Sequence, residues 1–382
     1  MKKIILFVLG ISFLVFSCKN TTENQDNVNL NEKIYKVGVF DGHGGAETCI
    51  WEAYHAISID PEMTPYYVTS SDITNGILDN LDALLIPGGG GSRQYLNLGK
   101  INEDKIKKFV ADGNGIIGIC AGAYLLSETP EYSCFAMNGA KAIDIEHDNR
   151  GHGICKFTLN EKGHELFPQL ADRDTCYLMY YEGPVYVESD NDSIKYTVFA
   201  TMESDVHEEG NAPKNMTNNK PFIIGNNYGK GKVISCIAHP EATPGMIWMI
   251  PAMVRWSINA EPINYKAEVV NPDIFNREIL MSIEDLHKEN SFFKVFLYGT
   301  ADEKIEALDW LQNHHSWSAK RWIQGLLYDE NASVRIRAAK YIADINYLQY
   351  LDDLKAIYNN ELDVEVKDSI KVHLDKLSNL LP

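Results

Sequence analysis

The pentapeptide Gly118-Ile119-Cys120-Ala121-Gly122 constrains this chain more than any other segment. The residues before it predict a turn and a short buried strand, and those after it predict the start of a helix. Cys120 therefore falls at a sharp strand-to-helix corner. Such a corner needs small residues two positions on either side, because the turn brings backbone segments too close for a Cβ. The first turn of a helix also favours thiolate over thiol, so Cys120 is a candidate nucleophile.

A candidate base for this nucleophile stands late in the chain. His239-Pro240-Glu241 follows the apolar run 233–238, which predicts a central strand. In an extended chain residues two apart point the same way, so the Glu241 carboxylate is expected to orient the His239 ring. The imidazole would then face Cys120. Together the three residues satisfy the nucleophile, base and orienter pattern of a catalytic triad.

A third segment supplies candidate oxyanion donors. The apolar residues 84–86 run through Pro87 into four glycines, 88–91. We expect the backbone of Gly88, Gly89 and Gly90, with the amide after Cys120 at Ala121, to face a developing oxyanion and the substrate. No Gly-Lys-Ser/Thr follows and no dinucleotide fingerprint is present, so a phosphate loop is disfavoured.

The combination of these motifs resembles the class I glutamine amidotransferase-like superfamily. Three further segments resemble most closely the N-terminal domain of some biotin-protein ligases. They are residues 37–45 (VGVFDGHGG), 118–124 (GICAGAY) and 180–184 (YYEGP). The resemblance covers about residues 34 to 259. It implies a flavodoxin-like sheet and a Cys-His-Glu triad made of Cys120, His239 and Glu241.

Two functional interpretations stay open. No synthase or other acceptor-activating module is visible, and the ligase catalytic domain is missing, so an active triad would hydrolyse an amide of an unknown small substrate. Alternatively, the cleft holds a small ligand without catalysis, since a buried cysteine is often simple core filling. No cofactor is expected under either interpretation.

Other polar residues carry weaker signals. Asp41 and His43 lie in a Gly-rich loop after the first strand, where open α/β sheets bind ligands. They are expected near the substrate, although a turn that only needs polar residues fits equally well. The cluster Glu146-His147-Asp148, with His152 and Cys155, matches no tight zinc spacing and is interpreted as a polar loop. We predict no metal site.

The first residues predict export. A basic Met1-Lys2-Lys3, an apolar stretch from 4 to 16 and a Ser17-Cys18 boundary resemble a bacterial lipoprotein signal. Residues 1–17 would be the signal peptide, Cys18 the lipidated residue, and 18–33 a flexible tether. We therefore expect a lipid-anchored protein of the bacterial cell envelope, held to the membrane by its anchor only.

The composition argues against nucleic acid as a partner and against a disulfide-stabilised fold. The formal charge of −18 over 382 residues argues against nucleic acid, whose phosphates would be repelled. Seven cysteines are too few for a disulfide-stapled scaffold. With Cys18 lipidated and Cys120 free, an odd number remains, and no pairing can be assigned.

Periodicity divides the rest of the chain into two regions. Alternating strand and helix patterns predict a doubly wound α/β domain over 34–260, with an antiparallel insertion between 155 and 199. Expected strands include 34–40, 63–68 and 81–86, and expected helices include 46–57, 103–112 and 246–259. Residues 273–382 predict a smaller all-α domain. The segment 326–339 resembles a HEAT-type repeat, whose groove would hold a protein partner, although a plain helical bundle fits equally well.

Overall fold

The computed structural model describes residues 33–382 except 148, 191–193, 209 and 211. The expected signal peptide, the lipidation site Cys18 and all of the tether but Lys33 lie outside the described residues, as does Asp148. Residues 34–382 form one compact unit, so both predicted domains fall inside it. Over the described part of the chain, no helix combines the length and apolar character needed to cross a membrane.

The centre of the α/β domain is a parallel sheet with strand order β2-β1-β3-β4-β11. Its strands are β1 (Tyr35–Phe40), β2 (Met63–Val68), β3 (Ala83–Ile86), β4 (Gly115–Ile119) and β11 (Gly231–Cys236). The strands β3 and β4 are buried along their whole length, as expected where helices cover both faces of a parallel sheet. This is the flavodoxin-like order, and the α/β prediction is confirmed.

An antiparallel half extends the same sheet, which has ten strands in all. From β11 it continues through β10 (Lys220–Tyr228), β9 (Thr197–Met202) and β6 (His152–Leu159), which also pairs β7 (Cys176–Tyr181) and β12 (Ile279–Leu280). The expected antiparallel insertion is therefore part of the main sheet. A separate two-stranded sheet joins β5 (Ala140–Ala142) and β8 (Tyr186–Glu188).

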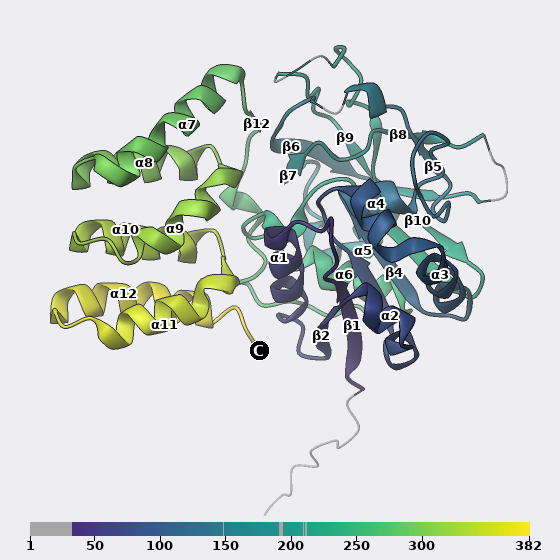
Figure 1. Ribbon diagram of the computed structural model, residues 1–382, viewed down its shortest axis with the longest axis horizontal. Helices are drawn as coiled ribbons and strands as arrows, with labels where there is room; N and C mark the ends of the chain where they lie inside the picture. Colours follow the sequence, from purple (N-terminus) through teal and green to yellow (C-terminus); the bar gives the residue numbers. More distant parts are fainter. Residues whose placement is uncertain (1–32, 148, 191–193, 209, 211) are drawn as a thin grey trace, which may run out of the picture. The chain divides into compact units, whose positions relative to one another are not determined.

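Helices flank this sheet (Figure 1). They are α1 (Glu47–Ile57), α2 (Ser70–Thr74), α3 (Gly91–Ala111), α4 (Ala121–Leu126), α5 (Glu161–Leu166) and α6 (Met249–Ser257). The sequence predicted a helix only over 103–112, whereas α3 begins at Gly91. The difference arises at Gly99, whose φ of 68° and ψ of 170° interrupt the helical backbone and with it the periodicity.

The C-terminal region is helical, as predicted. Its helices are α7 (Ile283–Tyr298), α8 (Ala301–Asn313), α9 (Lys320–Leu326), α10 (Ala332–Asp344), α11 (Leu351–Asn360) and α12 (Val364–Ser378). They stack as the pairs α7/α8, α9/α10 and α11/α12 (Figure 1). Capping boxes at Ser282 and Thr300 start the first pair.

Buried polar contacts join the helical region to the α/β domain. The His315 Nε2 atom lies 2.9 Å from the carbonyl oxygen of Ala242. Lys320, the first residue of α9, forms an ion pair with Glu52 of α1, and both side chains are 2% exposed. Burial raises the pKa of Glu52 to about 7, although the Lys320 charge opposes this shift. A buried ion pair of this kind fixes the position of the segment that carries it.

Candidate active site

Cys120 occupies the corner between β4 and α4. Its backbone has φ 50° and ψ −106°, a conformation that residues with a side chain rarely adopt. Such strain persists where the surroundings enforce it, and it is common at nucleophiles. Here the Cys120 amide donates to the carbonyl oxygen of Cys236 on β11 at 2.9 Å. The corner is thus held against the strand that leads to His239.

The glycines on either side of Cys120 have no room for a side chain. A Cβ added at Gly122 would lie 2.1 Å from the carbonyl oxygen of Ile86, and one at Gly118 would lie 2.7 Å from the carbonyl oxygen of Gly122. Both obstacles are backbone atoms, which cannot rotate away. The close approach inferred from the glycine spacing is therefore present at both positions.

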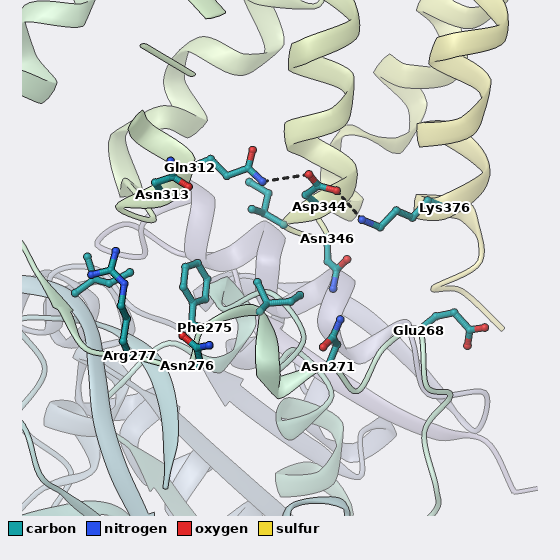
Figure 2. Close-up of a pocket in the computed structure, with 13 residues that line it drawn as sticks. Glu268, Asn271, Phe275, Asn276, Arg277, Gln312, Asn313, Asp344, Asn346 and Lys376 are labelled. Carbon is teal, nitrogen blue, oxygen red and sulfur yellow. Dashed lines mark hydrogen bonds and ion pairs between the residues drawn. The ribbon is translucent and has the colours of Figure 1, made fainter. Parts of the chain in front are cut away.

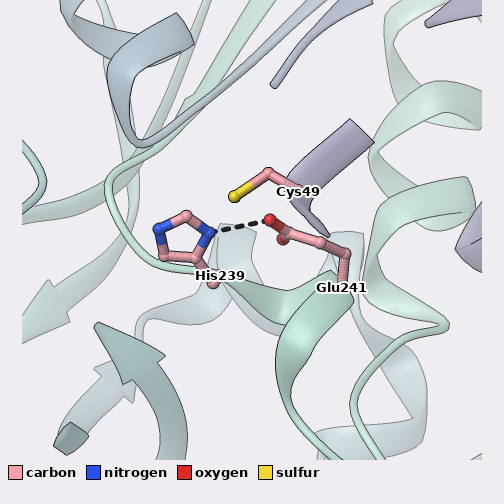
Figure 3. A group of neighbouring side chains, drawn as sticks. All are labelled: Cys49, His239 and Glu241. Atoms are coloured by element: carbon pink, nitrogen blue, oxygen red, sulfur yellow. Dashed lines mark hydrogen bonds and ion pairs between the residues drawn. The ribbon is translucent and has the colours of Figure 1, made fainter. Parts of the chain in front are cut away.

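His239 and Glu241 form the second part of the site. The His239 Nδ1 atom lies 2.7 Å from Glu241 Oε1, and both side chains are buried (Figure 3). The sequence interpretation assumed an extended chain here, and that assumption is wrong. Pro240 instead starts a short 3-10 helix, η4 (Pro240–Ala242), because its fixed φ suits the first helical position. The tight turn brings the carboxylate to the ring.

His239 links this carboxylate to the thiol. Since Nδ1 is engaged by Glu241, Nε2 is left for Cys120. Burial alone would lower the pKa of His239. The negative charges of Cys120 and Glu241, together with hydrogen bonds to Cys120 and Cys49, outweigh burial and hold that pKa well above its usual range. The site therefore favours a protonated imidazole beside the sulfur of Cys120.

Cys49 on α1 is a second thiol at the same imidazole. Its side chain is buried beside the ring (Figure 3), and burial raises its pKa, so it is a neutral neighbour of His239. The sequence analysis left Cys49 among the unassigned cysteines. No local pattern marks it, since only the packing of α1 places it at His239.

The glycine loop after β3 lies next to the triad. It is tied to the loop after β1 by two hydrogen bonds, from the Ala46 amide to Gly88 O at 3.0 Å and from the Gly90 amide to Gly44 O at 2.7 Å. The Gly90 amide is thus engaged and is not an oxyanion donor, contrary to expectation. A Cβ on Gly88 would lie 2.7 Å from His239 Cε1, so Gly88 makes room for the ring.

A cavity of about 720 Å³ lies over Cys120 and His239. Its other lining residues are Ala46, Cys49, Gly89, Gly90, Gly91, Ser92, Arg93, Ala121, Tyr124, Tyr132, Ile145, Tyr181, Glu182, Trp317 and Arg321. Asp41 and His43, expected near the substrate, are exposed and are not among the described residues that line it. This loop is hydrogen-bonded to the glycine loop through the backbone of Gly44 and Ala46.

The helical region contributes to this cavity, which the sequence analysis did not foresee. The Trp317 ring in η6 (Trp317–Ala319) packs edge-on against the His239 ring, with 4.8 Å between centroids. It also lies 5.9 Å from the Tyr181 ring. Arg321 of α9 lines the same space. No nearby motif in the sequence signals the position of Trp317 against the imidazole.

One group of described residues has a geometry that a metal ion could use. The ligand atoms of Cys49, His239 and Glu241 all lie within 4.8 Å of one another. The hydrogen bond between His239 and Glu241 already explains two of these three donors, so the set fits a triad with a neighbouring thiol. The polar cluster that includes His147, His152 and Cys155 forms no such group among its described members.

A second cavity, of about 390 Å³, lies where the segment 268–279 meets the ends of the helices (Figure 2). Asn271, Arg277, Asp344 and Lys376 are among its lining residues. Its described lining includes neither cysteine nor histidine, so no nucleophile of the triad type lies there.

Part of this chain is similar in sequence to subunits of known enzymes. The subunit PurQ of phosphoribosylformylglycinamidine synthase from Picrophilus torridus is 25% identical over 195 residues, which are 46% of this chain and 75% of that protein. The imidazole glycerol phosphate synthase subunit HisH of Helicobacter hepaticus is 30% identical over 115 residues, 27% of this chain and 53% of that protein.

Among solved structures, the glutaminase domain of CTPS from Trypanosoma brucei with bound acivicin has a TM-score of 0.41 at 11% identity. The match covers 60% of this chain and 96% of that chain.

Residues 35–255 match the family model described as "Biotin-protein ligase, N terminal". This match and the relatives confirm the predicted resemblance to the glutamine amidotransferase-like proteins and to the ligase N-terminal domain. The matched residues hold Cys120, His239 and Glu241 and make up more than half of the chain, which therefore belongs to the biotin-protein ligase N-terminal family.

Proposed function

We propose that this protein is a cysteine-dependent hydrolase that cleaves the C–N bond of a small amide. The observation that supports this most is the strained Cys120 corner beside a buried His239–Glu241 pair, open to a cavity of about 720 Å³. Strain, charge coupling and access at one sulfur are what a nucleophile requires. A cysteine that only fills a core needs none of them.

The reaction would proceed in two steps. The Cys120 thiolate attacks the amide carbon, the C–N bond breaks, and the protonated imidazole of His239 gives its proton to the leaving nitrogen. A thioester remains on Cys120. A water molecule then attacks the thioester carbon while His239 takes the proton of the water. The S–C bond breaks, the acid is released, and the Cys120 thiolate and the protonated His239 are restored.

Two backbone amides are the best placed oxyanion donors. Ala121 is the first residue of α4, where backbone N–H groups lack helical acceptors, and Gly89 of the glycine loop lines the same cavity. Of the other two expected donors, Gly90 already donates its amide to the carbonyl oxygen of Gly44, and Gly88 lies against the His239 ring. The backbone amides of Gly89 and Ala121 would thus stabilise the negative oxygen of the tetrahedral intermediate.

We further propose that the enzyme is lipid-anchored through Cys18 in the bacterial cell envelope, and that its helical region also recruits a protein partner. The basic start, short apolar stretch and Ser17-Cys18 boundary support the first part. The stacking of three helix pairs, which is typical of solenoid binding surfaces, supports the second (Figure 1).

The hydrolase proposal is tested by incubating full-length protein with a panel of small primary amides and measuring ammonia release. Acid quenching and mass spectrometry would detect the acyl group on the Cys120 peptide. We expect release and acylation in the wild type and neither in C120S. If no amide acylates Cys120 and the wild type matches C120S throughout, the cleft is a binding site and the rival interpretation holds.

A further inference from the structure

Two arginines from distant parts of the chain line the cavity over Cys120. Arg93 lies in the first turn of α3, directly after the glycine loop, and Arg321 lies in α9 of the helical region. Both side chains are exposed. The cavity therefore has a cation on the α/β domain and another on the helical region.

Neither guanidinium has a structural partner among the described residues. Five other arginines do, and each pairs with a carboxylate: Arg150 with Asp144, Arg173 with Asp273, Arg255 with Asp60, Arg335 with Glu361 and Arg337 with Asp309. In a chain of net charge −18, a free arginine is easily neutralised by a neighbouring acid. Three arginines have no carboxylate partner among the described residues; Arg277 lies outside this cavity, whereas Arg93 and Arg321 both line it and are available to a ligand.

The position of Arg321 is set by rigid neighbours. Lys320, the preceding residue, is buried in its ion pair with Glu52, and its ammonium lies 3.8 Å from the Trp317 ring centroid. The Lys320 carbonyl oxygen accepts a hydrogen bond of 2.8 Å from the Tyr350 hydroxyl. The backbone that carries Arg321 is therefore fixed at the cavity wall, while the side chain remains free to reach into it.

We propose that the substrate is a small amide that also carries an oxyanion, a carboxylate or a phosphate, and that Arg93 and Arg321 bind this group. Planar guanidinium forks match both oxyanions. One carboxylate, Glu182, lines the same cavity, so the two cations exceed it by one charge. The inference rests on the proposed function and extends it, because the helical region would then take part in substrate selection.

The test compares two alkylating reagents of similar size at Cys120. Iodoacetate carries a carboxylate where iodoacetamide has a neutral amide. A change in the reactivity of the thiol affects both rates alike and cancels in their ratio, so the ratio reports the effect of the reagent's charge. Site-resolved mass spectrometry of the full-length protein gives both rates. We expect each of R93Q and R321Q to lower the iodoacetate to iodoacetamide ratio by about threefold, from Coulomb attraction over several ångströms near solvent. The loss should shrink at high salt.

Matched variants separate a local effect from net charge. R277Q removes an exposed arginine outside the cavity and should leave the rate ratio unchanged. R321K keeps the positive charge, so its rate ratio should stay close to that of the wild type. If added glutarate slows the alkylation of Cys120 by iodoacetate, the anionic group of the substrate is a carboxylate. If added inorganic phosphate slows it, that group is a phosphate. In R93Q/R321Q either protection should be lost.

The outcomes distinguish this inference from the proposed function. If Cys120 reacts selectively but R93Q and R321Q give the same ratio as R277Q, the oxyanion site is wrong and the hydrolase proposal stands. If Cys120 of the wild type reacts with both reagents no faster than in H239A, the hydrolase proposal fails, and the substrate inference fails with it.

Discussion

Replacing Glu241 with glutamine removes one negative charge from the triad and keeps nearly the same shape. Glu241 Oε1 lies 2.7 Å from His239 Nδ1, and the two side chains are 1% and 2% exposed. A hydrogen bond to a charged group contributes about 1.5–3 kcal/mol in proteins. Since one pKa unit corresponds to about 1.4 kcal/mol, E241Q should lower the pKa of His239 by about one to two units. The thiolate–imidazolium pair would then be about 10- to 100-fold less populated.

The assay is the rate of Cys120 alkylation by iodoacetamide at neutral pH, resolved by mass spectrometry of the Cys120 peptide. E241Q should react about 10- to 100-fold more slowly than the wild type. The control is E268Q, which removes an exposed carboxylate that does not line the cavity over Cys120 and should react at the wild-type rate. An E241Q rate equal to that of E268Q would refute the assignment of Glu241 as the residue that orients and charges His239.

Three further predictions concern stability, and each is read from urea unfolding. G122A should lower the free energy of unfolding by about 1–3 kcal/mol, since its Cβ would meet a backbone oxygen. The control G325A, with open space around its Cβ, should not lower it. Equal losses in the two variants would contradict the packing argument. K320M should lower the free energy of unfolding by about 3–5 kcal/mol, because it leaves Glu52 buried and unpaired. The double variant E52Q/K320M should recover most of this loss. A double variant as unstable as K320M would show that the lost ion pair is not the cause. Burial, aided by the Lys320 charge, lowers the pKa of His315 from 6.5 to about 3, so only the unfolded chain takes up this proton as pH falls below 6.5. Wild-type stability should therefore drop by about 2 kcal/mol more than that of H315Q by about pH 5; parallel pH profiles would contradict this.

The parts of the site that depend on local geometry were predictable from the sequence. Gly118 is constrained by the backbone of its own strand-to-helix corner, and Gly122 by the backbone of the neighbouring strand β3. Their spacing around Cys120 is visible in the sequence, so it identifies the corner. His239 and Glu241 are two residues apart, and their contact needs only a short turn. Here the interpretation still erred on the path of the chain, since Pro240 starts a 3-10 helix in place of an extended segment.

The remaining parts depend on tertiary packing that no local pattern encodes. Cys49 reaches His239 through the packing of α1. Trp317 and Arg321 reach the cavity because contacts between the helical region and the α/β domain, such as the Lys320–Glu52 ion pair, hold their segment there. Helical periodicity reports which face of a helix is apolar, but not which domain that face meets. For the same reason Asp41 and His43, at the expected end of β1, were placed in a cleft that their side chains do not line.

The most direct test of the account is the pH dependence of Cys120 alkylation by iodoacetamide in the wild type and in H239A. If His239 and Cys120 exist as a charged pair, the wild type should reach half of its maximal rate well below the alkaline range of an ordinary thiol. The H239A midpoint should move up into that range. Identical alkaline midpoints in the two proteins would contradict the central claim that His239 activates Cys120.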